Sequence, residues 1–128
     1  MRFPTLHEAI ACNEAVRESS EVSPTADDDD LDRVDGALRR AGTRADPIEA
    51  AAAIVYEVAA AQGFYEGNKR TAILLARWFI STNTTLDPDT LIQPDDQPLG
   101  ELLIATARGE DRYGAVYGLL RERARGKP

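Results

Sequence analysis

Two apolar segments of helical length, joined by a short glycine-containing loop, constrain the fold of this chain most strongly. The first begins at Asp46 and Pro47, which suit an N-cap and a first helical position. Residues 50–61 are then small or apolar around most of the helix circumference, which indicates burial on nearly all sides. A second apolar run covers residues 71–80. We therefore expect two central helices on either side of a short loop.

Shorter patterns before and after this pair predict further helices and no strand. A capping box formed by Thr5 and Glu8 predicts a helix from about residue 5 to 18, and a second helix should follow the acidic run and end at Ala41-Gly42. After a proline-rich polar stretch, helices are expected at about residues 98–107, with Gly109 as a stop, and at about 111–125. The predicted fold is all-α: a compact single domain over residues 1–128, with six or seven helices.

Size and charge limit the classes of partner. The chain has 128 residues, which suits one domain, and its 15 Lys and Arg against 22 Asp and Glu give a net charge of -7. Binding to nucleic acid or to anionic membrane is therefore not expected.

The N-terminus lacks a secretory pattern and no run approaches about 18 apolar residues, so we expect a cytoplasmic protein. The single cysteine, Cys12, is expected to be a small buried residue of the first helix.

The loop between the central helices carries the most informative polar residues. Gly63 and Gly67 allow tight turns, and the helix that follows presents unpaired N–H groups at its start. Asn68, Lys69 and Arg70 add donors and positive charge at the same end. Cations in a first helical turn oppose the helix dipole, so their presence indicates a nearby anion such as phosphate.

Other interpretations of the charged segments were weighed. A Walker loop is rejected because Asn68 and Arg70 interrupt its spacing and a helix precedes the loop. Alternatively, Gly63 is a plain C-cap and the charges form a solvated face. The four carboxylates of residues 27–30 suit a helix N-terminus better than a metal site, because consecutive residues do not converge on one ion.

The loop resembles the signature of the Fic/Doc family, H-x-F-x-[DE]-[GA]-N-[GK]-R. The matching residues are Phe64, Glu66, Gly67, Asn68, Lys69 and Arg70. The alanine-rich helix before the loop and the aromatic-bearing helix after it resemble the family's context. The resemblance implies a Fic/Doc-type helical bundle that uses ATP or another nucleotide, with Mg2+, to modify a hydroxyl of a protein substrate.

The resemblance also implies roles for individual residues. Phe64 anchors the loop in the core, Gly67 and Asn68 form an anion hole, and Arg70 pairs with phosphate. Lys69 stands where AMP-transferring members usually have glycine, so the sequence is more similar to Doc toxins, which transfer the terminal phosphate. The implied catalytic residues are Gln62, Asn68, Lys69 and Arg70, the implied nucleotide-binding residues are Gly63, Gly67, Asn68, Lys69 and Arg70, and the implied metal ligand is Glu66.

Gln62 departs from the family signature, which has a histidine there. An amide has no basic nitrogen near neutral pH, and loss of a general base typically costs about 10²- to 10⁴-fold in rate. The only histidine, His7, is expected to be a partly exposed residue of the first helix. Three functions stay open: an impaired Doc-like transferase, a pseudoenzyme that still binds nucleotide, and an interaction module with an anion site. A match of residues 106–110 to the family's autoinhibitory motif is judged accidental, so any regulation falls to a separate antitoxin protein.

Overall fold

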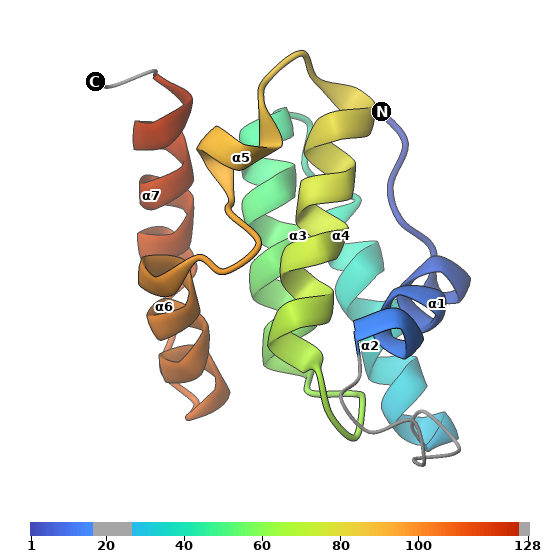
Figure 1. Ribbon diagram of the computed structural model, residues 1–128. Coiled ribbons are helices and arrows are strands. Elements are labelled where there is room, and N and C mark those ends of the chain that lie inside the picture. The colour runs from blue at the N-terminus through green and yellow to red at the C-terminus, as the bar shows by residue number, and fades with distance from the viewer. Residues whose placement is uncertain (17–26, 126–128) are drawn as a thin grey trace.

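The computed structural model describes residues 1–16 and 27–125, and in these ranges all regular structure is helical. The helices are α1 (Leu6–Val16), α2 (Asp28–Ala41), α3 (Pro47–Ala61), α4 (Asn68–Asn83), α5 (Pro88–Leu91), α6 (Gln97–Ala107) and α7 (Tyr113–Ala124). They form one bundle, with α3 and α4 side by side in its middle (Figure 1). The predicted all-α fold is confirmed. No helix in the described ranges is long and apolar enough to cross a membrane.

Helix α3 is the centre of the bundle. It packs against α2, α4, α6 and α7, and the side chains from Ala50 to Val55 are all buried. Alanine allows neighbouring helices to approach closely, which explains how four helices fit around one. Asp46 caps the helix by accepting a hydrogen bond from the backbone N–H of Glu49 at 3.0 Å, as the sequence predicted.

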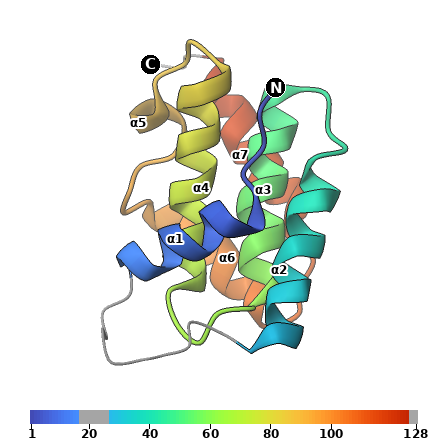
Figure 2. The same ribbon diagram turned by 90° about the vertical axis from the view of Figure 1, so that its right-hand side faces the viewer.

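The N-terminal part of the chain lies against α4 at two places. Helix α1 crosses the lower part of α4, and the preceding segment then runs up to its far end (Figure 2). At that end the Asn83 amide donates to the carbonyl of Arg2 at 2.8 Å and accepts from its N–H at 2.6 Å. The rings of Phe3 and Phe79 lie 5.0 Å apart. Both ends of α4 are thus tied to the N-terminal segment.

The structure changes several predicted boundaries. Helix α1 was expected to reach residue 18, but its described part ends at Val16 and residues 17 and 18 lie outside the described ranges. The proline-rich stretch contains the short helix α5, which the sequence analysis missed, although Asp87 and Pro88 supply its N-cap and first position. Helices α6 and α7 begin within two residues of the predicted positions.

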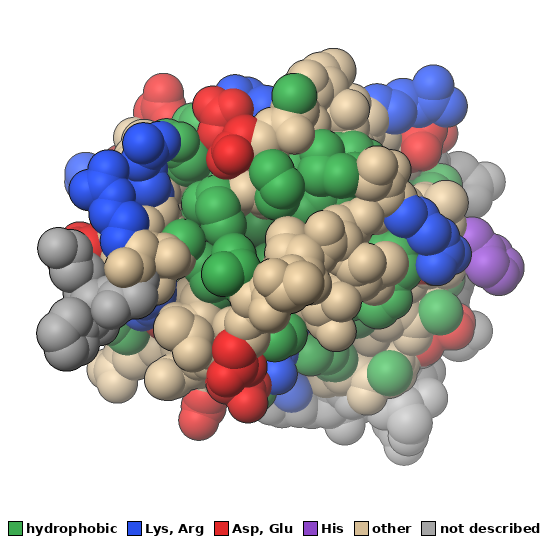
Figure 3. All heavy atoms as spheres, turned by 90° about the horizontal axis from the view of Figure 1, so that it is seen from above, with side chains coloured by type: hydrophobic (Ala, Val, Ile, Leu, Met, Phe, Trp, Pro, Cys, Tyr) green, Lys and Arg blue, Asp and Glu red, His purple; other side chains and the backbone are tan. Residues whose placement is uncertain are grey.

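The end of the bundle farthest from the 62–67 loop has an apolar surface. Viewed onto this end, hydrophobic side chains gather in the middle and charged side chains surround them (Figure 3). A depression of about 240 Å³ is lined there by residues that include Leu86, Leu91 and Ala124. Leu86 is 38% exposed, so this apolar surface is partly open to solvent.

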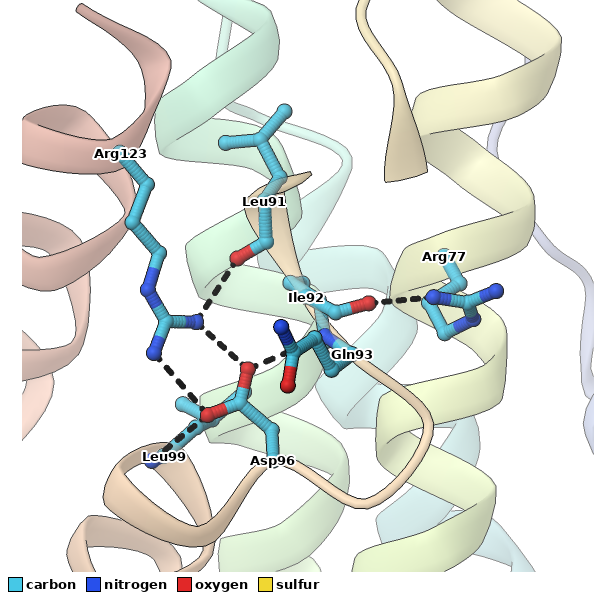
Figure 4. A network of polar contacts seen from close by, with 7 residues as sticks. All are labelled: Arg77, Leu91, Ile92, Gln93, Asp96, Leu99 and Arg123. Atoms are coloured by element: carbon cyan, nitrogen blue, oxygen red, sulfur yellow. Dashed lines mark hydrogen bonds and ion pairs between the residues drawn. The ribbon is translucent and has the colours of Figure 1, made fainter. Parts of the chain in front are cut away.

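A buried ion pair fixes the segment between α5 and α6. Asp96 is the N-cap of α6 and forms an ion pair with Arg123 of α7, whose Nη1 lies 2.5 Å from Oδ2 (Figure 4). The same carboxylate accepts from the backbone N–H of Gln93 at 3.0 Å and of Leu99 at 3.2 Å. Arg123 also donates to the carbonyl of Leu91 at 3.0 Å. Three segments of the chain therefore meet at one carboxylate.

The environment of Asp96 makes its contribution to stability depend on pH. Burial alone would raise its pKa, but the hydrogen bonds from Arg123, Gln93 and Leu99 bring the pKa below the ordinary value of 3.8. The folded protein thus binds this proton less readily than the unfolded chain. The stabilisation is complete above the ordinary pKa and is lost as pH falls through the lower folded-state value.

We expect Asp96→Ala to lower the free energy of unfolding by about 3 kcal/mol at pH 7, because it leaves Arg123 unpaired and removes a helix cap. Asp46→Ala is the matched control, since it removes an exposed N-cap with one hydrogen bond and should cost about 1 kcal/mol. Urea unfolding measures the loss in free energy of unfolding for each variant. The difference between the two losses should become smaller below pH 4. Equal losses at pH 7 would contradict the role given to the ion pair.

Candidate functional site

The loop of residues 62–67 is closed by the side chain of Asn68. Its Oδ1 accepts from the backbone N–H of Phe64 and its Nδ2 donates to the carbonyl of Phe64, both at 3.0 Å. Phe64 is only 4% exposed and anchors the loop in the core, as expected. The amide side chain of Asn68 is therefore used to fold the loop, and its backbone N–H stands at the start of α4.

Two residues of the loop adopt left-handed backbone conformations. Gly67 has φ 77° at the N-cap of α4, and Gln62 has φ 46° at the C-cap of α3. Gln62 is the only non-glycine residue with positive φ in the described part of the chain. The alternative interpretation of Gly63 as a plain C-cap is wrong, because Gln62 is the C-cap of α3. A non-glycine residue seldom adopts this conformation, which costs conformational energy.

Gly63 is required by the packing of α2. A Cβ atom at this position would lie 2.3 Å from Cγ2 of Val34 and 2.6 Å from the carbonyl oxygen of Asp30. Such contacts are far shorter than van der Waals separation, so only glycine allows α2 to lie this close. The packing alone is sufficient to explain glycine here, beside the nucleotide-binding role that the family resemblance implies.

The side chain of Gln62 is held against α6. Its Nε2 donates to the carbonyl oxygen of Ala107 at 3.1 Å, and the backbone carbonyl of Gln62 accepts from the Arg33 guanidinium at 3.3 Å. The side-chain amide of Gln62 thus connects the end of α3 to the end of α6. Ala107 uses one of the two N–H donors of Nε2, and the Oε1 atom accepts hydrogen bonds but is not a base, so the amide can orient a hydroxyl in the site without taking its proton.

A cleft separates the start of α4 from α6. Its narrow part has a volume of about 190 Å³ and is lined by Gln62, Asn68 and Lys69 together with residues of α6. Its wide part, of about 530 Å³, is lined by Lys69 and Arg70 on one wall and residues including Asp95 and Glu101 on the other. Lys69 and Ile104 line both parts, so the two adjoin.

The structure brings together four of the predicted site residues and leaves three aside. Gln62, Asn68, Lys69 and Arg70 line the cleft, whereas Gly63, Glu66 and Gly67 line neither of its two described parts. Glu66 is partly exposed in the turn before α4, and its carbonyl accepts a hydrogen bond from Asn13 of α1 at 2.8 Å. Sequence reasoning did not find Asn13. A polar residue on the apolar face of the first helix was the available signal.

The electrostatics of the cleft favour an anion. The first turn of α4 contains no acidic residue, and its N-cap, Gly67, has no side chain to cap the helix. The positive end of the helix dipole therefore acts with the exposed cations Lys69 and Arg70 at one place. The carboxylates of Asp95 and Glu101 make the opposite wall negative. The cleft thus has one end that suits phosphate and another that suits hydrogen-bond donors.

The remaining residues considered as candidates have surroundings that are typical of structural residues. His7 is exposed on α1, and Cys12 is partly buried, which raises the pKa of its thiol. The Tyr65 hydroxyl donates to Asp27 at 2.5 Å, and this hydrogen bond raises the pKa of the phenol. In the described ranges no three His, Cys, Asp or Glu side chains are grouped to hold a metal ion. At the acidic start of α2, Asp27 thus contacts the loop through Tyr65 and makes no side-chain capping hydrogen bond, and Asp30 forms an ion pair with Arg33.

An all-helical bundle in which a cleft separates the start of a central helix, with its two cations, from α6 agrees with the family that the loop signature suggested. A model of the Fic/DOC family matches residues 8–80, which is more than half of the chain. The chain belongs to the Fic/DOC family. The match runs from α1 into α4, includes the whole loop and leaves α5, α6 and α7 outside. A search of curated proteins found no match.

Family membership supports transferase-type chemistry in general terms, with a nucleotide and Mg2+ as the reactants that the family commonly uses. The polar groups in and beside the cleft suit both a nucleotide and Mg2+. The positive end of a helix and two cations suit phosphate, and the Glu66 carboxylate is the type of oxygen ligand that Mg2+ prefers.

We expect Gly63→Ala to lower the free energy of unfolding by about 2 kcal/mol, because the added methyl must displace α2. Gly118→Ala on α7 is the matched control: its Cβ would meet no atom within 4 Å, and the better helix propensity should stabilise the protein by up to about 1 kcal/mol. Thermal unfolding of both variants should show shifts of opposite sign. An unchanged melting temperature for Gly63→Ala would contradict the close approach of α2.

Proposed function

We propose that this protein is a Doc-like transferase scaffold that binds ATP and Mg2+ to phosphorylate a hydroxyl of a target protein, and that Gln62 impairs the reaction. The observation that carries the proposal is the placement of Lys69, Arg70 and the Gln62 side chain along one cleft. Phosphate bound at the start of α4 is then next to the position from which a base would act.

The two parts of the cleft favour one orientation of the nucleotide. The narrow part, with Gln62 and Lys69, has room for a phosphoryl group, and the wide part has room for a nucleoside. Lys69 also lies over Gly100, with its Nζ 3.6 Å from where a Cβ of Gly100 would stand. A lysine here pairs with phosphate and restricts the space that an α-phosphate would need. We therefore place the γ-phosphate nearest to Gln62.

The chemistry of phosphoryl transfer requires a base, which the Gln62 amide does not supply. The target's hydroxyl oxygen forms a bond to the γ-phosphorus while the bond to the β-bridging oxygen breaks, and ADP leaves with the electron pair. Asn68, Lys69 and Arg70 stabilise the phosphate charge at the start of α4, and Mg2+ held by Glu66 and the phosphates would neutralise charge on the leaving group. The hydroxyl proton must go to a base, and the Gln62 amide does not take it.

A nucleotide-binding pseudoenzyme is the second candidate function. The hydrogen bond between Gln62 and Ala107 favours it, because it gives the glutamine a defined structural place that spans the cleft. In that case the protein would act by binding a nucleotide or a partner's acidic group, and an antitoxin protein would be one possible type of partner. The two candidates share the binding site and differ in whether transfer occurs.

We expect the protein to bind ATP with Mg2+, and Arg70→Ala to weaken binding by about tenfold, because a charge-assisted hydrogen bond to phosphate is lost. Arg39→Ala is the matched control: Arg39 lies on α2 in an exposed ion pair with Asp35, and its loss should leave the affinity unchanged. Titration calorimetry measures all three proteins. Equal binding by the Arg70→Ala protein and the wild type, or no binding by either, would overturn the assignment of the site.

We expect Gln62→His to raise the rate of transfer at least about tenfold, because an imidazole supplies the missing base. With ATP labelled on either the γ- or the α-phosphate and a candidate target protein, label should pass from the γ position alone. Mass spectrometry should show one added phosphoryl group. Transfer of AMP would contradict the orientation argued from Lys69, and a wild-type rate equal to that of the variant would show that Gln62 is no impairment.

A further inference from the structure

Asn13 is a fully buried amide that touches the loop from outside the family signature. It lies on α1, and its exposed fraction is 0%. Its Nδ2 donates to the carbonyl oxygen of Glu66 at 2.8 Å and to the Thr71 hydroxyl at 3.1 Å. A single side chain therefore joins α1 both to the turn before α4 and to the first turn of α4 itself.

The position of Asn13 also limits the size of the side chain that residue 67 can have. A Cβ atom on Gly67 would lie 3.1 Å from the Asn13 Nδ2, so the glycine and the amide are in close contact. Gly67 has its φ at 77° there, which glycine adopts without strain. The amide thus packs against the residue whose left-handed turn directs the chain into α4.

The amide is retained at an energetic cost to the fold. Its Oδ1 is buried and has no hydrogen-bond partner among the described residues. Burying an unsatisfied acceptor is unfavourable, and an apolar residue would avoid that cost. Turning the amide over would place oxygen against the Glu66 carbonyl, so both donors are needed where they are. Such an arrangement indicates selection for the position of the loop.

We propose that Asn13 is a positioning residue that sets the Glu66 carboxylate in place for the Mg2+ of a Mg2+-nucleotide. This inference rests on the proposed function. Outer contacts of this kind orient a metal ligand without touching the metal, and their loss typically costs about 10- to 100-fold in affinity or activity. Asn13 acts through the Glu66 backbone and is not itself a ligand.

Asn83 provides a matched control at the other end of the same helix. It too is an asparagine whose Nδ2 makes two hydrogen bonds, to the carbonyl oxygens of Arg2 at 2.8 Å and Phe79 at 2.9 Å. Like Asn13, it ties the N-terminal part of the chain to α4. Alanine at either position removes an amide that links the N-terminal part of the chain to α4; Asn13 is fully buried and Asn83 is partly buried, and Asn13 alone of the pair contacts the loop.

The experiment compares ATP binding, with and without Mg2+, by the wild type, Asn13→Ala and Asn83→Ala at a temperature where circular dichroism shows all three folded. Asn13→Ala should weaken Mg2+-ATP binding about tenfold and change Mg2+-free binding less. Asn83→Ala should match the wild type in both. If Asn13→Ala does not fold, Asn13→Ser replaces it, because its hydroxyl can hold a water in the vacated space but cannot reach Glu66.

The outcomes separate this inference from the proposed function. Binding by the wild type with no difference between the two alanine variants overturns the positioning role and leaves the proposed function standing. Equal weakening with and without Mg2+ also overturns it, because Asn13 would then be a general support of the fold. Failure of the wild type to bind Mg2+-ATP overturns both. Hydrogen exchange of the loop amides should rise in Asn13→Ala and stay unchanged in Asn83→Ala.

Discussion

The close packing of helices around the alanine-rich surface of α3 is the constraint on which the structure depends. Because its buried residues from Ala50 to Val55 include four alanines in succession, α2, α4, α6 and α7 can all approach one helix. The approach of α2 requires glycine at position 63, and the approach of α6 brings the Ala107 carbonyl to the Gln62 amide. The geometry of the loop therefore follows from packing that is fixed elsewhere.

The loop combines this packing with a start of α4 that attracts anions. Phe64 is buried and Asn68 closes the turn, so the backbone that leads into α4 is held from within. Asn13 holds the same turn from α1. Cations in the first helical turn oppose the helix dipole, and here they line a cleft of sufficient size for a nucleotide. This placement of Lys69 and Arg70 is consistent with a binding role.

The sequence predicted the features that depend on local signals and missed those that depend on contacts between distant segments. Asp46 and Pro47 predict the start of α3, which the structure confirms. The signature residues predict the family, and the match over residues 8–80 confirms it. The left-handed conformation of Gln62 and the clash that forbids a side chain at Gly63 arise only when α2 and α6 are in place. Ala107 contributes a backbone carbonyl, which no side-chain pattern reveals. The roles of the signature residues stay predictions.

The central claim is that the phosphate site is intact while the general base is missing. A crystal structure of the protein with Mg2+ and a non-hydrolysable ATP analogue tests it most directly. The account predicts a triphosphate at the start of α4, with Arg70 on its oxygens, the metal on Glu66 and the γ-phosphate nearest to the Gln62 amide. An empty cleft at saturating analogue, or a nucleotide bound on another face of the bundle, would contradict it.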